Sequence, residues 1–196
     1  MTINAVLFDI GGVLLTLGEA SYRLQLAQRL GLSTIPASYE AQAPYLQRGE
    51  LAESLFWAEM AGRPVADTFC DDVWLAHFRP IPAMWQVAAE LRSMGIRTGI
   101  LSNTQTSHVR LMQGMGFLHE FAPVILSCEV GLRKPEPAIF RYALQRLALP
   151  AHQVAYVDDV PEYVAAATTL GLQTVLHTGD ITATRTRLLQ MVEAEG

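Results

Sequence analysis

Polar side chains that could bind a metal ion and a phosphate group stand directly after short apolar runs of this sequence. Asp9, Ser102-Asn103 and Asp158-Asp159 each follow such a run, and Lys134 lies a few residues beyond another. The charge of the three carboxylates would be balanced by one Mg²⁺ ion and the Lys134 ammonium, because Mg²⁺ prefers oxygen ligands. A carboxylate can also split phosphate-ester hydrolysis into two steps through an aspartyl-phosphate, and Asp9 is the natural attacker.

Each of these signals has an ordinary explanation when it is taken alone. An aspartate that follows a strand commonly caps a loop, and Asp158-Asp159 could cap a helix that begins near Pro161. Lys134-Pro135 could be an exposed turn, and Ser102-Asn103 could start a helix. Their shared position is more informative, because ligands of doubly wound sheets bind beyond the carboxyl ends of the strands.

The elements that would position these residues alternate between short apolar runs and longer amphipathic ones. From residue 80 onward this alternation is typical of βαβ units and predicts an α/β fold with a doubly wound parallel sheet. Short apolar runs are expected for strands that are buried on both faces. The predicted strands are Ala5–Phe8, Ile96–Leu101, Val124–Ser127, Val154–Val157 and Thr174–His177.

Helical spacing of apolar residues predicts helices between these strands, two of which end before Gly95 and Gly171. The apolar positions are Met84, Val87, Ala88, Leu91 and Met94; Phe140, Ala143, Leu144 and Leu147; and Val160, Val164 and Ala167.

Residues 16–79 contain no convincing strand and give three or four helix-length segments, separated by Gly31, Gly49 and Gly62. Two apolar stripes support this interpretation. They are Tyr22, Leu26, Ala27 and Leu30, and then Leu51, Leu55, Phe56 and Ala58. We predict a small helical bundle at 16–79, inserted into an α/β core of residues 1–15 and 80–196. Two separate domains joined by a linker would isolate the first strand from its sheet.

Four short motifs occur in order along the chain. They are Phe8-Asp9-Ile10-Gly11-Gly12-Val13, Leu101-Ser102-Asn103, Lys134-Pro135 and Val157-Asp158-Asp159. As an ordered set they resemble the motifs of the haloacid dehalogenase-like hydrolase superfamily, over nearly the whole chain. The opening most resembles the phosphatase branch that begins Phe-Asp-x-Gly-Gly/Asn-Val. The resemblance implies a Rossmann-like sheet of strand order 3-2-1-4-5, with a small helical cap at 16–79.

The resemblance also implies roles for individual residues. The implied Mg²⁺ ligands are Asp9, the backbone carbonyl of Gly11, Asp159 and Asp158, the last of these directly or through water. The implied phosphate-binding residues are Ser102, Asn103 and Lys134, and the implied catalytic residues are Asp9 and Lys134. Charged donors such as Lys134 form strong hydrogen bonds to phosphate oxygens.

The first motif departs from most phosphatases of this superfamily, which carry a second Asp where this chain has Gly11. That Asp protonates the leaving group and then activates water. Glycine keeps its backbone carbonyl but supplies no acid. Leaving groups that need little protonation are therefore favoured, namely anomeric sugar phosphates, acyl phosphates and aryl phosphates over simple alkyl monoesters. His108 is a conceivable substitute acid, although a histidine on a helix surface is the more common case.

Composition excludes several other classes of protein. The 196 residues include 14 Lys and Arg against 19 Asp and Glu, and the resulting charge of −5 argues against a nucleic-acid partner. With 51% hydrophobic and 17% charged residues, the chain is expected to fold. No apolar run reaches the roughly 18 residues of a membrane span. The segment Met1-Thr2-Ile3-Asn4 does not resemble a signal peptide, so a cytoplasmic location without a membrane partner is expected. Cys70 and Cys128 are expected to be small buried hydrophobes.

No motif marks the residues that would select a substrate or set the oligomeric state. Tyr45, Arg48 and Trp57 could face a substrate, with Arg48 meeting a second anionic group. The alternative is that Trp57 and Trp74 are core residues of the bundle and that Arg48 is a solvated charge.

The leading hypothesis is a Mg²⁺-dependent phosphatase of small soluble phosphate esters, for example sugar phosphates, in which the bundle closes over Asp9. One alternative is a homologue that binds phosphate but has lost turnover because of Gly11, and that serves as a binding or regulatory module. Another is a metal-independent 2-haloacid dehalogenase. Asp158 and Asp159 argue against it, because their charges would repel a carboxylate substrate.

Overall fold

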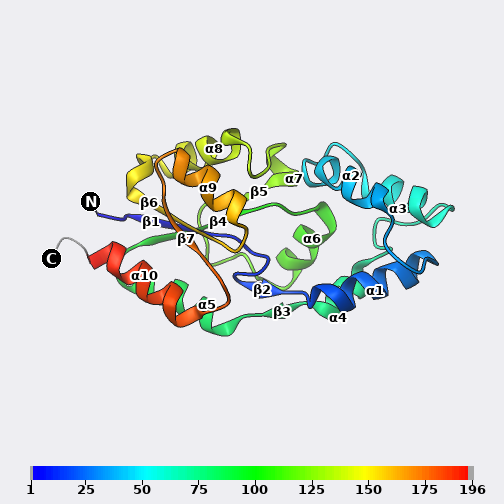
Figure 1. Cartoon of the computed structure of the whole chain (residues 1–196), viewed down its shortest axis with the longest axis horizontal. Coiled ribbons are helices and arrows are strands. Elements are labelled where there is room, and N and C mark those ends of the chain that lie inside the picture. The colour runs from blue at the N-terminus through cyan, green and yellow to red at the C-terminus, as the bar shows by residue number, and fades with distance from the viewer. Residues whose placement is uncertain (1, 194–196) are drawn as a thin grey trace.

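A five-stranded parallel sheet forms the centre of the protein (Figure 1). The structure is a computed structural model that describes residues 2–193, apart from the side chain of Glu19. The sheet has the order β5-β4-β1-β6-β7. Its strands are β1 (Ala5–Phe8), β4 (Arg97–Ser102), β5 (Val124–Leu126), β6 (Val154–Asp158) and β7 (Gln173–Leu176). Counted along the chain this is the order 3-2-1-4-5, so the predicted doubly wound fold is confirmed, with every predicted strand present.

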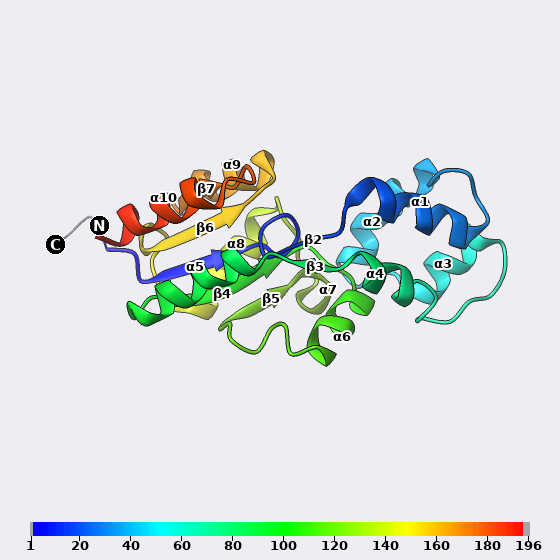
Figure 2. The same ribbon diagram turned by 90° about the horizontal axis from the view of Figure 1, so that it is seen from below.

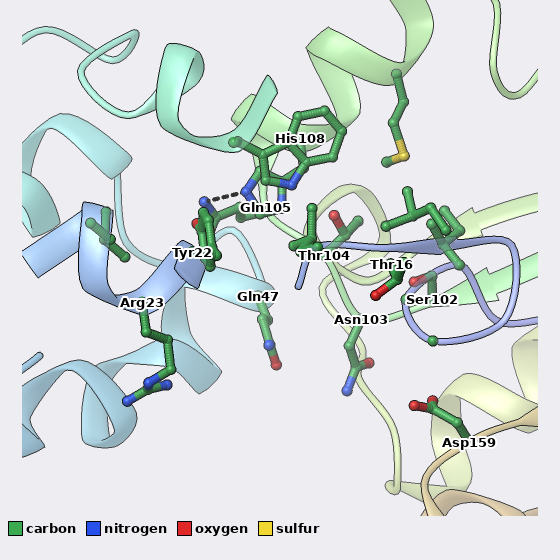
Figure 3. Close-up of a pocket in the computed structure, with 18 of the residues that line it drawn as sticks. Thr16, Tyr22, Arg23, Gln47, Ser102, Asn103, Thr104, Gln105, His108 and Asp159 are labelled. Atoms are coloured by element: carbon green, nitrogen blue, oxygen red, sulfur yellow. Dashed lines mark hydrogen bonds between the residues drawn. The ribbon is translucent and has the colours of Figure 1, made fainter. Parts of the chain in front are cut away.

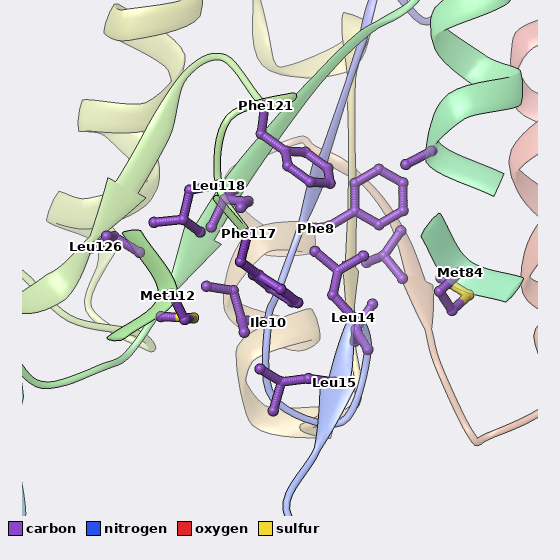
Figure 4. Close-up of a cluster of buried hydrophobic side chains, with 14 of the residues drawn as sticks. Phe8, Ile10, Leu14, Leu15, Met84, Met112, Phe117, Leu118, Phe121 and Leu126 are labelled. Atoms are coloured by element: carbon purple, nitrogen blue, oxygen red, sulfur yellow. The ribbon is translucent and has the colours of Figure 1, made fainter. Parts of the chain in front are cut away.

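Helices cover both faces of the sheet, which explains why its strands are continuous apolar runs. Successive side chains of a strand point to opposite faces. Val6 and Phe8 of β1 join the hydrophobic layer beneath α5 and α10, and Ala5 and Leu7 join the layer beneath α8 and α9. Figure 4 shows the first layer around Phe8. The covering helices are α5 (Pro82–Ser93), α10 (Ile181–Glu193), α8 (Pro137–Leu147) and α9 (Pro161–Thr169). Helix α10 has no counterpart among the predicted helices.

Four helices follow the first strand and lie at one end of the molecule, while both termini lie at the other (Figures 1 and 2). They are α1 (Glu19–Leu30), α2 (Ala37–Gln47), α3 (Glu53–Ala61) and α4 (Asp71–His77). The chain enters and leaves them through a short antiparallel pair, β2 (Leu15–Thr16) and β3 (Arg79–Pro80). The expectation that residues 16–79 contain no strand is therefore wrong, because Thr16 and Arg79 belong to this pair. A two-residue ladder is too short to leave an alternating pattern. The boundaries of the core at 15/16 and 79/80 stay a prediction, and residues 1 and 194–196 of that core lie outside the described residues.

The two predicted stripes of this helical segment have different outcomes. The four residues predicted for α1 are all buried, which confirms the first stripe. The second is right for Phe56, which is buried, and wrong for Leu55, which is 65% exposed; α3 buries Glu53, Phe56 and Trp57. These three share one helical face, and the large area of Trp57 outweighs that of the leucine. Met94, predicted for the buried face of α5, is 42% exposed because it follows the last turn of that helix.

Three further helical segments lie in the connections between strands of the sheet. They are α6 (Thr106–Gly114), α7 (Ser127–Val130) and the 3-10 turn η1 (Ala151–Gln153). Both cysteines are free thiols, Cys70 buried and Cys128 half-buried. Over residues 2–193, no helix has the length and apolar character needed to cross a membrane.

We predict that Phe140→Ala destabilises the fold strongly. Phe140 has no exposed surface, and its ring packs edge-on against Tyr156 at 5.6 Å. The substitution should lower the free energy of unfolding by about 3–5 kcal/mol, because it removes buried apolar area and leaves a cavity. Urea unfolding measures this loss. Leu55→Ala is the control and should change the free energy by less than about 0.5 kcal/mol; equal losses would contradict the assignment of the core.

Candidate active site

The polar residues singled out in the sequence converge at one edge of the sheet. Asp9 follows β1, Ser102 ends β4, and Asp158 ends β6. Strand β1 lies between β4 and β6, and the chain builds one side of the sheet before it crosses to the other. The loops after β1 and β6 therefore diverge at a topological switch point, the usual position of ligand sites in such sheets. Lys134 reaches the same edge from the loop between α7 and α8.

Lys134 is the centre of a buried ion cluster. Its side chain has essentially no exposed surface, and its Nζ lies 2.8 Å from Asp9 Oδ1 and 2.6 Å from Asp158 Oδ2. The rings of Tyr156 and Tyr163 stand 5.6 and 5.0 Å from the same nitrogen. The two carboxylates raise the pKa of Lys134 although burial opposes the charged form. Lys134 is thus a permanently charged interior group, and the exposed-turn interpretation of Lys134-Pro135 is wrong.

Asp9 is buried, with 7% of its surface exposed. Burial raises its pKa to about 6, while Lys134 and the Ser102 hydroxyl act in the opposite direction. Asp158 adds a repulsive charge that raises the pKa further. Asp9 is therefore mainly ionised at neutral pH, which leaves a carboxylate oxygen capable of nucleophilic attack.

Asp158 and Asp159 are adjacent in sequence but have different surroundings. Asp158 is fully buried; its Oδ2 accepts hydrogen bonds from Lys134 and Tyr156, and its Oδ1 accepts one from the backbone of Val160 at 2.8 Å. Helix α9 begins one residue later, so Asp158 orders the approach to the helix and is not its N-cap. Asp159 is exposed and lines the cavity. One carboxylate oxygen from each of Asp9, Asp158 and Asp159 lies within 4.8 Å of the others.

Two neighbouring glycines, Gly11 and Gly12, line the cavity, and the structure requires glycine only at Gly12. Gly12 has φ +74°, and a Cβ atom there would overlap the carboxylate of Asp159. Only glycine lets this carboxylate pack so closely against the loop after β1. At Gly11 a Cβ atom would meet nothing within 4 Å, and no positive φ requires glycine. Neither the space nor the backbone conformation at position 11 therefore requires glycine in place of the acid.

The side chain of Asn103 is committed to positioning Lys134. Its Nδ2 donates to the Lys134 carbonyl at 2.9 Å, and its Oδ1 accepts from the Lys134 backbone N–H at 2.8 Å. Tyr163 provides a further acceptor at 3.3 Å. Helix α6 begins at Thr106, so Ser102-Asn103 precede the helix and do not start it. Tyr156 and Tyr163 are site residues that the sequence did not reveal, because a tyrosine in a strand or helix has the pattern of an ordinary core residue.

A cavity of about 450 Å³ extends from this cluster into the helical segment. In Figure 3, Ser102, Asn103 and Asp159 stand at one end, and Tyr22 and His108 stand toward the other. The lining residues from the helical segment are Thr16, Leu17, Tyr22, Arg23, Leu26, Ile35, Tyr39, Gln47 and Trp74. The residues that line the cavity therefore come from both parts of the chain.

The three candidate substrate contacts Tyr45, Arg48 and Trp57 are not among the residues that line this cavity. Trp57 is fully buried, which confirms it as core, and Tyr45 is 54% exposed. Arg48 does not line this cavity and is not a fully solvated charge, because it forms an ion pair with Glu136 at the start of α8. Trp74 is buried, as predicted for the core, but its edge also forms part of the cavity wall.

His108 also differs from both sequence interpretations. It lines the cavity, its ring stacks on Trp74 at 4.8 Å, and its Nε2 lies 3.1 Å from Gln105 Nε2. Burial lowers the pKa of His108 to about 3. The imidazole is therefore neutral at physiological pH and has no acidic proton for a leaving group.

Two contacts with α6 hold the helical segment against the core. The Glu53 Oε1 of α3 accepts a hydrogen bond from the Ser107 N–H in the first turn of α6 at 2.5 Å. On the same helix, Arg110 forms an ion pair with Asp71 at 2.6 Å. Glu53 is a buried acid whose role no sequence motif indicated. It joins the helical segment to the helix that follows the Ser102-Asn103 loop.

Comparison with known proteins agrees with this architecture. The model of the haloacid dehalogenase-like hydrolases matches residues 3–171, so the chain belongs to this hydrolase family. It is 25% identical over 198 residues to a sesquiterpene phosphatase of Aspergillus oryzae, covering 97% of each chain. It is 34% identical over 106 residues to a glyceraldehyde 3-phosphate phosphatase of Methanocaldococcus jannaschii, covering 53% of this chain and 46% of that protein. The chain spans only 18% to 46% of the length of several other curated relatives that it matches.

Solved structures share the fold. A predicted family hydrolase from Porphyromonas gingivalis superposes with a TM-score of 0.82 at 24% identity, covering 97% of this chain and 99% of that one. A family enzyme from Bacteroides thetaiotaomicron, solved with magnesium and inorganic phosphate, superposes with a TM-score of 0.78 at 22% identity, covering 91% and 96%.

We predict that His108 makes stability depend on pH. The pKa of this group is lower in the folded chain than in the unfolded chain, so the unfolded chain binds more protons between about pH 6.5 and pH 3. The free energy of unfolding should therefore fall as the pH falls through this range, by on the order of 1 kcal/mol at pH 5. Urea unfolding at pH 7 and pH 5 measures the loss. His108→Gln should lose less stability than the wild type; an identical loss would show that other groups are responsible.

Proposed function

We propose that the chain is a Mg²⁺-dependent phosphatase that hydrolyses small phosphate monoesters through an aspartyl-phosphate on Asp9. The observation that carries the proposal is the buried Lys134 between Asp9 and Asp158, with Asp159 at the adjoining cavity wall. A cation and three carboxylates meet at a switch point. That arrangement is suited to a doubly charged oxyanion once a second cation is present.

The donor set fits Mg²⁺. Asp9, Asp158 and Asp159 are hard oxygen donors grouped within 4.8 Å, and Lys134 neutralises only one of their charges. Asp158 already accepts three hydrogen bonds, so Asp9 and Asp159 are the proposed direct ligands, with Asp158 nearby or acting through water. The Gly11 carbonyl is the proposed third ligand. When bound, Mg²⁺ would offset the charge of the phosphate and polarise its oxygens.

Asp9 would act as the nucleophile. Its carboxylate oxygen forms a bond to phosphorus while the bond from phosphorus to the ester oxygen breaks, and the leaving group departs with that electron pair. Water then attacks the same phosphorus, which releases inorganic phosphate and restores the carboxylate. Lys134 and the Ser102 hydroxyl, with the Asn103 backbone, would bind the phosphate oxygens. The Asn103 side chain would instead hold the Lys134 loop in place.

The leaving group would receive no proton from position 11. Glycine has no carboxyl group, and His108 is neutral. We therefore keep the inference that leaving groups of low basicity are preferred. Two matched relatives are named as phosphatases, and one family structure contains magnesium and phosphate, which supports the reaction class.

We predict that Asp9→Asn abolishes phosphatase activity. The asparagine amide is not a nucleophile for phosphorus, so phosphate release with Mg²⁺ should fall by about 10³-fold or more. Release of inorganic phosphate across a panel of monoesters measures this, and EDTA should remove the wild-type activity. A urea unfolding curve shows that the variant is folded. Activity equal to wild type would disprove Asp9 as the nucleophile.

Two other outcomes would favour the other functions. If no ester is hydrolysed but phosphate ligands raise the melting temperature, the chain is a phosphate-binding module. Halide release from 2-haloacids in the presence of EDTA would instead indicate a dehalogenase.

We predict that Gly12→Ala weakens Mg²⁺ binding. Its Cβ atom would displace the Asp159 carboxylate, so the affinity measured by calorimetry should fall at least tenfold, or about 1.4 kcal/mol. Gly62→Ala is a matched control, because Gly62 also has a positive φ but its Cβ atom would meet nothing within 4 Å. Its Mg²⁺ affinity should stay within about twofold of wild type. Unchanged affinity in Gly12→Ala would exclude Asp159 as a ligand.

A further inference from the structure

The part of the cavity that lies away from the ion cluster contains many apolar side chains. Its wall contains aliphatic side chains from both parts of the chain together with aromatic rings. These residues are Leu15, Leu17, Tyr22, Leu26, Ile35, Tyr39, Trp74 and Met112. Leu15, Leu26, Trp74 and Met112 are buried behind this wall, so the half-buried Leu17, Ile35 and Tyr39 supply most of its apolar surface. A wall of this kind binds the apolar part of a ligand by removing it from water.

The long polar side chains on the same wall already have partners within the protein. Arg23 forms an ion pair with Glu40 at 2.7 Å, and Gln105 contacts His108 at 3.1 Å. Gln47 accepts a hydrogen bond from Arg133 at 3.2 Å. A sugar held here would lose hydration of its hydroxyl groups and regain only part of that hydrogen bonding, because these contacts already occupy one atom of each of the three side chains. Burial of an unpaired hydroxyl costs about 1–3 kcal/mol.

The charge distribution also restricts the ligand. Arg23 is the lining arginine, and its charge is compensated by Glu40 while its guanidinium stands over the Tyr39 ring at 5.7 Å. A second phosphate or carboxylate on the ligand would therefore meet no uncompensated cation on this wall. The cavity is suited to a ligand with one anionic end, placed at Asp9, and one uncharged end.

A flat surface stands opposite the phosphate end. His108 and Trp74 stack at an interplanar angle of 25°, and Tyr22 lies nearby in Figure 3. The buried indole supports the half-buried imidazole from behind, so the His108 ring and the edge of Tyr22 are the aromatic surface available to a planar ligand.

We propose that the substrates are aryl phosphate monoesters, with the ring against Tyr22 and His108. This inference rests on the proposed phosphatase activity. In the first step the Asp9 oxygen bonds to phosphorus and the phosphorus–oxygen bond of the ester breaks. The phenolate leaves with the electron pair and takes its proton from water. A phenolate is a far weaker base than an alkoxide, so it leaves without the acid that Gly11 lacks. Among the leaving groups that Gly11 favours, the cavity therefore selects aryl over sugar.

The test compares 2-naphthyl phosphate with glucose 1-phosphate in the presence of Mg²⁺. We expect kcat/KM for 2-naphthyl phosphate to exceed that for glucose 1-phosphate by at least tenfold. We also expect 2-naphthyl phosphate to raise the melting temperature more than glucose 1-phosphate does at equal concentration. Equal or reversed preference in both measurements would overturn the proposal.

Ile35→Asn tests the wall itself. Ile35 is half-buried in the loop between α1 and α2 and lines the cavity, whereas Leu55 of the same helical segment is exposed and does not. Ile35→Asn should lower kcat/KM for 2-naphthyl phosphate about tenfold and leave that for glucose 1-phosphate within twofold. Leu55→Asn should change neither. Leu17→Asn replaces Ile35→Asn if the latter unfolds. An unchanged preference in the folded variant would refute the role of the wall.

The two proposals fail in different ways. If wild type releases phosphate from neither ester, the phosphatase proposal fails, and the shift in melting temperature still decides the ligand class. If glucose 1-phosphate is hydrolysed as fast as 2-naphthyl phosphate, the phosphatase proposal stands and the aryl assignment is wrong.

Discussion

The buried ammonium of Lys134 is the constraint on which the rest of the site depends. A lysine without exposed surface is tolerated only when opposite charges lie beside it, since an unpaired buried charge costs several kcal/mol. Asp9 and Asp158 meet this need from the ends of two adjacent strands, β1 and β6. Asn103, from the end of β4, holds the Lys134 backbone in place. One cation thus ties together three strands and the loop before α8.

The two aspartates at the end of β6 have different surroundings. Asp158 is saturated by interior donors, whereas Asp159 faces the cavity and packs against Gly12. Two adjacent aspartates therefore divide into a positioning residue and a candidate metal ligand. Beyond them the cavity wall contains more apolar side chains, which come from both the α/β core and the helical segment. The core would supply chemistry common to phosphate esters, and the helical segment would supply selectivity.

The sequence predicted the core better than the helical segment for a physical reason. Strands buried on both faces must be continuous apolar runs, and all five were found to within one residue. Helices near solvent have weaker patterns. The stripe assigned to α3 failed at Leu55, because a polar residue, Glu53, occupies the buried face where it bonds to α6. The β2–β3 ladder has only two residues in each strand and left no periodic signal.

The sequence by itself determined the strands, the helical stretch after the first strand and the polar residues at strand ends, because each depends on local runs of residues. The strand order was implied only by the resemblance of the ordered motifs to a known family. Only the tertiary structure decided how those residues divide their tasks. It separated Asp158 from Asp159, bound Asn103 to Lys134, and brought Tyr156 and Tyr163 to the cation. It also showed that Tyr22, Ile35 and Trp74 line the cavity. The candidates chosen from the sequence, Tyr45, Arg48 and Trp57, do not. These outcomes depend on which surfaces of distant segments meet, and no local pattern records that.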